Sequence, residues 1–363
     1  MKPFLLFASV QPGLEQQART ELQSEGIGVL AEYPGGFEFY GHNNAVYRLN
    51  NRLKTVSRIL IRFASFYADS FWMLENRAKK LPWEIYFKDQ YPVIRVNTRS
   101  SKLYHKDAVK ERLLSSIFFR LGKEMDPLQN KEQLIVVNIE DDIMNISIDT
   151  SGQHLHKRGW APWKTRAPLR ETIASAIVLS CPAITGAKRI ADPMCGSGTL
   201  LFETASILMR MPLFPFRSFS FESFPSFQEE IYGRVKTVLQ EEVRPLDAEL
   251  SGYDIDEQSI RACHHNISAM GIGGNFLLQK RDCETITQKE LQGCAIISNP
   301  PYGIRLKGHT APEALDLLYS LRKKGAVPCL CLLLDPSAPL SKNRFSIKFR
   351  VKNGNIPVYC ISF

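Results

Sequence analysis

The sequence predicts an α/β protein in which a doubly wound parallel sheet follows a smaller α+β module. After about residue 158, strand-like apolar runs alternate with helical stretches, which is the pattern of a parallel sheet with helices on both faces. Before that residue, shorter runs alternate between apolar and polar side chains and are joined by turns such as Pro34-Gly35-Gly36. The irregular stretch 152–168 separates the two patterns, so we place the domain boundary within it.

The chain before the boundary is expected to fold as two small α+β units. The first has the order β-α-β-β-α-β. In the second, Val109, Leu113 and Ile117 recur at helical spacing after Asp107, which we expect to be the N-cap of that helix. The expected strands are 4–10, two within 28–40, 57–66, 93–98, 133–139 and 144–149.

The chain after the boundary is expected to form the parallel sheet. A helix at 257–270 shows one apolar face and ends at Gly271, and the tail folds back as a hairpin around Asn353-Gly354. Residues 211–249, rich in Phe and Pro, form an oversized insertion. The expected parallel strands are 189–192, 250–254, 275–280, 295–298 and 327–334.

Composition narrows the class of partner. The net charge of +9 favours a polyanion, and after Asp335 the chain has several basic residues but no acidic one. No run approaches the roughly 18 apolar residues of a membrane span, so we expect no membrane. The eight cysteines form no C-x-x-C pair and no cluster with zinc spacing, so we expect no metal. Most lie in apolar runs, as reduced thiols do, which favours a cytoplasmic location.

The first motif follows the first strand of the expected parallel sheet, where ligands bind in such folds. Asp192 ends the strand, and Gly196 and Gly198 permit a tight turn before a helix that starts near Thr199. Position 201 is leucine, so the third glycine of a dinucleotide-binding fingerprint is absent, and the chain has no phosphate-binding P-loop. These absences weaken NAD and ATP as ligands. A purely structural turn remains the alternative.

Two further strands end in acidic residues. Asp254 can accept hydrogen bonds from the hydroxyls of a ribose, whereas Asp256 is more simply an N-cap. Asp282 can accept from an adenine amino group, and its alternative role is that of a surface turn residue.

The fourth strand is followed by Asn299-Pro300-Pro301-Tyr302. The Asn299 side-chain oxygen and the Pro300 carbonyl can accept the hydrogens of an exocyclic amine and stabilise charge that develops on its nitrogen. Tyr302 can stack on an extruded base. Methyl transfer to such a nitrogen needs alignment and no covalent nucleophile, so Cys195 and Cys283 are interpreted as packing residues. The alternative is a rigid turn with Tyr302 packed internally.

Together these motifs resemble those of class I S-adenosylmethionine-dependent methyltransferases that act on amino groups. The combination of residues 192–199 with Asn-Pro-Pro-Tyr-Gly at 299–303 resembles more closely the bacterial 23S rRNA guanine-N2-methyltransferases. The similarity also includes Pro12-Gly13-Leu14-Glu15 and the stretch 167–172. Where that family often has a glutamate after the second motif, this chain has Ile304.

The resemblance implies three domains and a set of roles. It implies a ferredoxin-like segment at 1–57, a THUMP RNA-binding domain at 58–157 and a seven-stranded Rossmann-like methyltransferase domain at 158–363. The residues it assigns to S-adenosylmethionine are Asp192, Pro193, Met194, Cys195, Gly196, Ser197, Gly198, Thr199, Asp254, Ile255, Asp282, Cys283 and Asn299. Asn299, Pro300, Pro301 and Tyr302 would hold the guanine.

We therefore expect an enzyme that methylates the N2 amine of a guanosine in structured RNA, with 23S rRNA as the first candidate. Two alternatives stay open: a methyltransferase for tRNA guanine-N2 or adenine-N6, and a non-catalytic RNA-binding factor in ribosome assembly. The target nucleotide and the oligomeric state are not determined by the sequence. The residues expected to contact RNA phosphates are Arg99, Lys102, Lys106, Lys157 and Arg158.

Overall fold

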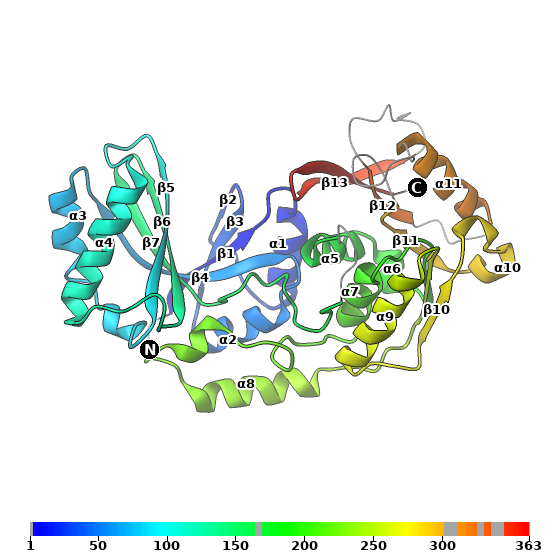
Figure 1. Ribbon diagram of the computed structural model, residues 1–363, viewed down its shortest axis with the longest axis horizontal. Helices are drawn as coiled ribbons and strands as arrows, with labels where there is room; N and C mark the ends of the chain where they lie inside the picture. Colours follow the sequence, from blue (N-terminus) through cyan, green and yellow to red (C-terminus); the bar gives the residue numbers. More distant parts are fainter. Residues whose placement is uncertain (1–2, 164–168, 301–310, 325–329, 335–344, 363) are drawn as a thin grey trace.

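The computed structural model describes residues 3–163, 169–300, 311–324, 330–334 and 345–362, and it contains two seven-stranded sheets. Figure 1 shows an elongated molecule with the N-terminal sheet at one end and the C-terminal sheet at the other. The α/β architecture and the seven-stranded second sheet confirm the predicted fold class. Pro301 and Tyr302 of the expected base-binding motif lie outside the described residues.

The first sheet has the strand order β2-β3-β1-β4-β7-β6-β5. Its elements are β1 (Phe4–Val10), α1 (Glu15–Ser24), β2 (Ala31–Tyr33), β3 (Gly36–Gly41), α2 (Asn43–Arg52), β4 (Val56–Tyr67), α3 (Phe71–Ala78), β5 (Tyr91–Arg99), α4 (Lys106–Leu121), β6 (Glu132–Glu140) and β7 (Ile143–Asp149). The long strand β4 pairs with β1 on one side and with β7 on the other, so the two N-terminal units share one sheet. The expected limit between residues 57 and 58 falls inside this strand.

One face of the first sheet is apolar along its whole width. Leu6, Ile61, Ile148, Ile135 and Ile94 are successive cross-strand partners, and all are buried. The buried sides of α1 to α4 belong to the same hydrophobic cluster. The apolar face of the sheet and the four helices thus contribute to one continuous core.

Two local expectations need correction. Helix α3 was not predicted, because its exposed Trp72 obscures the apolar stripe that Leu74 and Ala78 bury. Helix α4 begins at Lys106 with His105 in the cap position, so Asp107 is not the N-cap. Asp107 instead lies in the first turn, where its charge suits the helix dipole and its carboxylate contacts Lys110 at 2.8 Å.

The second sheet has the order β10-β9-β8-β11-β12-β14-β13. Its elements are α5 (Glu171–Leu179), α6 (Pro182–Thr185), β8 (Arg189–Asp192), α7 (Thr199–Leu208), α8 (Glu229–Glu241), β9 (Glu249–Asp254), α9 (Glu257–Met270), β10 (Phe276–Lys280), α10 (Gln288–Leu291), β11 (Ala295–Ser298), α11 (Ala311–Lys323), β12 (Leu330–Leu334), β13 (Ser346–Asn353) and β14 (Ile356–Ser362). The strand order reverses between β8 and β11, which is where α/β folds of this kind bind ligands.

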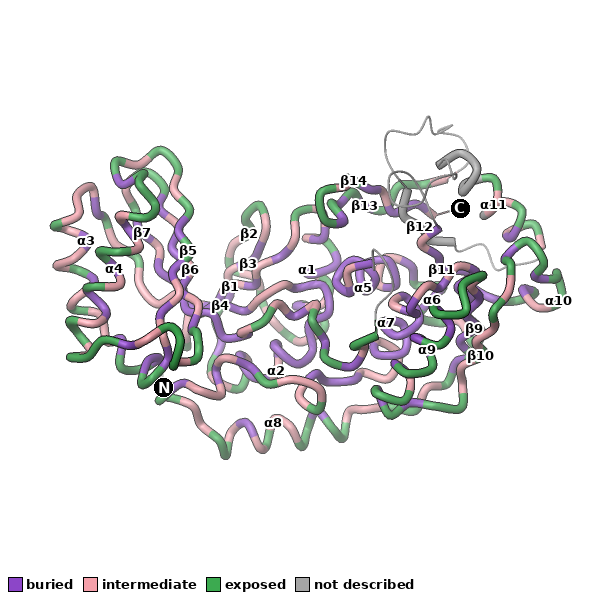
Figure 2. Tube along the Cα trace, viewed as in Figure 1, coloured by how far each residue is buried: buried purple, intermediate pink, exposed green. Residues whose placement is uncertain are grey.

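The interior of this second domain is formed by the strands and by α5 and α7. Every residue from Glu171 to Val178 is buried, so α5 is enclosed on all sides. Figure 2 shows this buried segment next to α7. β14 pairs antiparallel with β12 and β13, which confirms the predicted closing hairpin.

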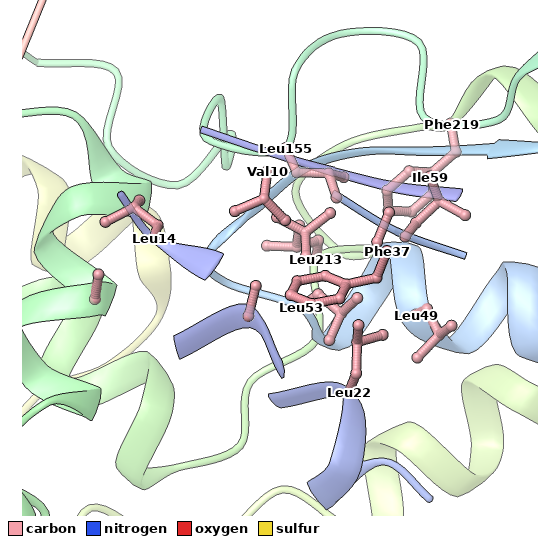
Figure 3. Packing of buried hydrophobic residues seen from close by; sticks show 14 of the residues in the cluster. Val10, Leu14, Leu22, Phe37, Leu49, Leu53, Ile59, Leu155, Leu213 and Phe219 are labelled. Atoms are coloured by element: carbon pink, nitrogen blue, oxygen red, sulfur yellow. The ribbon is translucent and has the colours of Figure 1, made fainter. Parts of the chain in front are cut away.

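The predicted insertion, residues 211–249, packs against the N-terminal domain and so joins the two domains. Its helix α8 lies against α2 of the N-terminal domain. Leu213 and Phe219 from the insertion pack into the N-terminal core beside Phe37 and Ile59 (Figure 3). Arg217 donates hydrogen bonds of 2.8–2.9 Å to four carbonyl groups of the interdomain connection, those of Ser151, Gln153, His154 and Lys157.

Arg158 was expected to contact RNA, and the structure contradicts this. Its side chain is 1% exposed and forms a two-pronged ion pair with the equally buried Glu203, at 2.9 and 3.1 Å. It also donates to the carbonyl groups of Leu155 and Lys54. Its donors are thus engaged inside the domain junction. A basic residue in a linker sequence does not show whether a buried carboxylate will pair with it. Here the helix Thr199–Leu208 supplies that carboxylate, Glu203.

Neither a membrane-spanning helix nor a metal-binding cluster is found among the described residues. Within those ranges, no helix is both long and apolar enough to cross a bilayer. The same ranges contain no group of three or more His, Cys, Asp or Glu side chains placed to hold a metal ion. Cys195, Cys263, Cys283, Cys294 and Cys360 are free and buried. Cys181 is disulfide-bonded.

We predict that Arg158→Met lowers the free energy of unfolding by about 3–5 kcal/mol, because the buried Glu203 loses the guanidinium that donates to both of its oxygens. Urea denaturation measures the change. Arg158→Met/Glu203→Leu should lose less than the single variant, and Lys157→Met at the exposed neighbouring position should stay within about 0.5 kcal/mol of wild type. An Arg158 variant of unchanged stability would contradict the structural role.

Candidate active site

The candidate site lies at the carboxyl ends of three neighbouring strands. Asp192 ends β8, Asp254 ends β9, and Ser298 ends β11 immediately before Asn299. β8 pairs in parallel with both β9 and β11, so these ends meet at one edge of the sheet. The structure therefore brings the first motif, the acidic residue of the second strand and the Asn-Pro motif together, as the sequence required.

Asp192 connects two of these strands. Its side chain is buried, and one carboxylate oxygen accepts hydrogen bonds from the Met194 backbone N–H at 3.1 Å and the Ser298 hydroxyl at 3.0 Å. Burial raises the pKa of Asp192 to about 7, and the nearby Asp254 carboxylate acts in the same direction. Asp192 is thus a positioning residue that fixes the start of the glycine loop against β11.

The glycine loop is fixed from the other side by Asp254. Asp254 Oδ2 accepts a hydrogen bond from the Gly196 N–H at 2.9 Å, and Oδ1 accepts one from the Asp256 N–H at the same distance. Burial raises the pKa of Asp254. Each oxygen retains a lone pair, so a loop-orienting carboxylate can also accept from a ligand hydroxyl.

The second glycine of the loop is required by both its backbone and its surroundings. Gly198 has a φ of +85°, and a Cβ there would lie 2.6 Å from the Phe202 ring and 3.0 Å from Cys263 Sγ. The backbone can therefore pass close to the start of α7 only without a side chain. This is the geometry in which backbone N–H groups at a helix start become available to a ligand.

Asn299 presents an unsatisfied acceptor. Its Oδ1 is buried and has no hydrogen-bond partner among the described residues. The adjacent Pro300 is also buried and has no N–H that could compete for an acceptor. A buried amide oxygen without a donor costs about 1–3 kcal/mol, so this atom is suited to an N–H group from a ligand.

Thr172 at the start of α5 was missed by the sequence reasoning. Its hydroxyl is buried without a partner in the described parts of the chain. The preceding Glu171 lines a small cavity together with Ser197 and Thr199 of the glycine loop. A free hydroxyl beside a helix N-terminus suits a carboxylate. The available signal was the family resemblance of the stretch 167–172, which includes this threonine.

The positions after β10 and β9 are more open. Asp282 is exposed and accepts a hydrogen bond from the Glu284 N–H at 2.9 Å, so it caps a short turn. Ile255 is 69% exposed directly after Asp254, and an uncovered apolar side chain there suits a planar apolar group. Asp256 is the N-cap of α9, as expected.

Neither cysteine of the motifs is prepared for nucleophilic attack. Burial raises the pKa of Cys283 to about 11. A hydrogen bond with Cys263, together with burial, raises the pKa of Cys195. Both thiols therefore stay protonated at neutral pH, as packing residues do.

The remaining expected RNA contacts are exposed, and three of them belong to the N-terminal domain. Arg99 and Lys102 lie where β5 ends, and their side chains are 81% and 67% exposed. They form ion pairs with Glu140 at 3.2 Å and Asp69 at 2.8 Å. Lys106 at the start of α4 and Lys157 are exposed.

Comparison with known proteins identifies the catalytic domain. A family model described as the RMKL-like methyltransferase domain matches residues 158–331, and one described as the RlmL ferredoxin-like domain matches residues 5–60. The chain carries an RMKL-like methyltransferase domain. S-adenosylmethionine, expected from the glycine loop, is the methyl donor of this domain. The unpartnered groups of Asn299 and Thr172 fit such a ligand.

Curated relatives match nearly the whole chain. A putative RNA methyltransferase, slr0064 of Synechocystis sp., is 28% identical over 98% of this chain and 96% of its own length. The ribosomal RNA large subunit methyltransferase K/L of Vibrio campbellii is 27% identical over 96% of this chain, which spans 51% of that protein. The putative RNA methyltransferase YpsC of Bacillus subtilis is 28% identical over 87% of this chain and 83% of its own length.

Solved structures share the complete two-domain arrangement. A putative methyltransferase, SMU.472, complexed with SAH, superposes with a TM-score of 0.83 at 25% identity, covering 100% of this chain and 98% of that chain. A possible methylase from Clostridium difficile 630 has a TM-score of 0.85 at 26% identity with the same coverage.

We predict that Asp192→Asn flattens the dependence of stability on pH. A carboxyl whose pKa is about 7 in the folded state, against 3.8 normally, stabilises the fold below pH 4 and loses that contribution as the pH rises through 7. The difference in unfolding free energy between variant and wild type should change by up to about 4 kcal/mol across this interval. Asp282→Asn, at an exposed carboxylate, is the control, and parallel curves for Asp192→Asn would contradict the prediction.

We predict that Thr172→Val weakens binding of S-adenosylmethionine by about 5- to 30-fold, because the hydroxyl that would meet the methionine carboxylate is lost. Isothermal titration measures the Kd. Thr204→Val removes a buried hydroxyl that is bonded to the Leu200 carbonyl within α7, and it should leave the Kd unchanged. Equal effects of the two variants would remove Thr172 from the site.

Proposed function

We propose that this protein methylates RNA, transferring the methyl group of S-adenosylmethionine to the exocyclic N2 amine of a guanosine in structured RNA, with 23S rRNA as the first candidate. The observation that carries the proposal is the buried, unpartnered Oδ1 of Asn299 at the edge of a methyltransferase sheet. The relatives named as RNA methyltransferases support RNA as the substrate class. The relative named for the large ribosomal subunit supports 23S rRNA.

Asn299 would orient the amine. The guanine N2 lone pair is delocalised into the ring, so the nitrogen becomes nucleophilic only when its geometry turns pyramidal. Acceptance of one N–H by Asn299 Oδ1 and of the other by the Pro300 carbonyl favours that geometry. These dipoles are in place before reaction and stabilise the positive charge that grows on nitrogen. Tyr302 would stack on the base.

The other residues would bind and align the donor. S-adenosylmethionine supplies an electrophilic methyl group. The loop 192–199 and Thr172 would hold its methionine part, Asp254 its ribose, and Ile255, Asp282 and Cys283 the region of its adenine. Displacement requires nitrogen, methyl carbon and sulfur in line, so the residues that fix the loop, Asp192 and Asp254, act through alignment.

The N-terminal domain would bind the RNA. We propose that residues 58–157 act as a THUMP domain and that Arg99, Lys102, Lys106 and Lys157 contact phosphates. Arg99, Lys102 and Lys106 belong to the N-terminal sheet and its helix α4, at the other end of the molecule (Figure 1), so one RNA fold would span both domains and deliver a base pulled out of its stack. Such binding weakens as salt concentration rises.

Adenine-N6 is the second candidate target. Asn299 and Pro300 can receive any exocyclic amine, and a solved structure named as a predicted N6-adenine-specific DNA methylase from Listeria monocytogenes superposes with a TM-score of 0.82 at 25% identity. A non-catalytic assembly factor is disfavoured, because such a protein gains nothing from leaving the Asn299 oxygen unpaired.

We predict that Asn299→Ala lowers methyl incorporation into RNA from a strain lacking the protein by about 100- to 1000-fold, because one transition-state acceptor is lost. Nucleoside mass spectrometry identifies the product. Asn275→Ala, which removes an amide that is bonded to the Leu246 carbonyl far from the site, is the control. N2-methylguanosine is expected. N6-methyladenosine would replace guanine with adenine as the target, and equal incorporation by variant and wild type would remove Asn299 from catalysis.

A further inference from the structure

The strand β13 carries a row of three exposed cations. Lys348, Arg350 and Lys352 are exposed, whereas the intervening Phe349 and Val351 are buried. Regular alternation from Phe349 onward places Arg350 and Lys352 on the same side, roughly 6.6 Å apart, and Lys348 precedes them at a β-bulge where the register with β14 shifts. That interval is comparable to the separation of successive phosphates along a nucleic-acid strand.

This row is not neutralised by the protein. Within the described ranges, none of the three side chains forms an ion pair, and the sequence has no acidic residue after Asp335. The cations of α3 and α4 differ, because many are paired with carboxylates. Those pairs are Lys79 and Arg112 with Glu75, Arg120 with Glu84, and Lys123 with Asp89. The β13 row is therefore a source of uncompensated positive charge.

The row leads toward the catalytic edge. β12 runs parallel to β11 and β8, and its last residue Leu334 pairs with Tyr359 of β14, which in turn pairs with Arg350. The Arg350 guanidinium lies 4.8 Å from the centre of the Tyr359 ring. Arg350 is thus level with the carboxyl end of β12, and Lys352 lies beyond it, toward the hairpin turn.

The N-terminal domain docks on the backbone of the same strand. Gly13 approaches so closely that a Cβ there would lie 1.8 Å from the Arg350 carbonyl oxygen. The Gln11 side chain donates to the Lys352 carbonyl at 2.5 Å and accepts from Arg170 at 2.9 Å. Figure 1 shows β13 beside α1 at this junction. The contact uses backbone atoms of β13 and leaves its cationic side chains exposed.

We propose that the exposed face of β13 binds the phosphate backbone of the substrate RNA. The bound segment would lie between the part of the RNA that contacts the N-terminal domain and the base that enters the pocket. The proposal rests on the RNA methyltransferase function and adds a second contact surface to it. Arg350 and Lys352 have a spacing that matches successive phosphates, and Lys348 adds a third exposed charge before them. Their course toward the edge that holds Asp192 and Asn299 places the bound strand near the pocket.

The test compares the triple variant Lys348→Gln/Arg350→Gln/Lys352→Gln with the matched triple Arg234→Gln/Lys236→Gln/Lys289→Gln, which removes the same charge from α8 and α10. The probe is unmodified 23S rRNA transcribed in vitro, bound to the full chain at several salt concentrations. The β13 triple should lower the slope of log K against log salt by about 2 and weaken binding roughly 10- to 50-fold at 0.15 M salt. The KM for RNA should rise by a similar factor with kcat nearly unchanged.

Several outcomes separate this inference from the function on which it rests. Affinity and salt slope equal to wild type in the β13 triple, or equal losses in both triples, would overturn the inference. An unchanged Kd for S-adenosylmethionine shows that the variant is folded. Failure of the wild-type chain to methylate RNA would overturn the proposed function, whereas its success beside an unaffected β13 triple would overturn the β13 surface alone.

Discussion

The arrangement of the active site depends on hydrogen bonds that two buried carboxylates make across the ends of three strands. Asp192 ties the end of β8 to Ser298 of β11, and Asp254 of β9 holds the Gly196 N–H. Glycines at positive φ supply no side-chain contacts of their own, so the loop is held by its neighbours, which include Asn266 of α9 donating to the Ser197 carbonyl. The two carboxylates supply those contacts at the point where the strand order reverses. Their elevated pKa values reflect the burial that this position imposes.

A second set of interactions fixes the two domains relative to each other. The ion pair of Arg158 with Glu203 is buried at the junction. The Arg217 guanidinium donates hydrogen bonds to four carbonyl groups of the connecting chain. The insertion adds Leu213 and Phe219 to the N-terminal core (Figure 3). An enzyme that receives its substrate on one domain and reacts on another needs a constant distance between them, and these contacts provide it. The insertion that interrupts the catalytic domain therefore has a clear structural use.

Local patterns predicted most of the elements, and the failures share a cause. Strands β1, β5 and β8, the α9 cap at Asp256 and the closing hairpin were predicted because each depends on residues adjacent in sequence. Arg158 was misassigned and Thr172 was overlooked because burial decides the role of each. Both residues lie in or near an irregular stretch. In such a stretch, side-chain periodicity does not show which distant segment of the chain will cover it.

The sequence by itself determined the order of strands and helices, the glycine loop and the Asn-Pro motif, since these follow from backbone preferences and short-range spacing. It also determined the excess of positive charge near the C-terminus. Only the tertiary structure decided which charged side chains are paired inside the protein and which stay unpaired on its surface. Arg158 meets a carboxylate 45 residues further along the chain, whereas Lys348, Arg350 and Lys352 meet none among the described residues. The reason is physical: an ion pair or an unpaired acceptor is set by distance and burial, and both arise only when remote segments pack together.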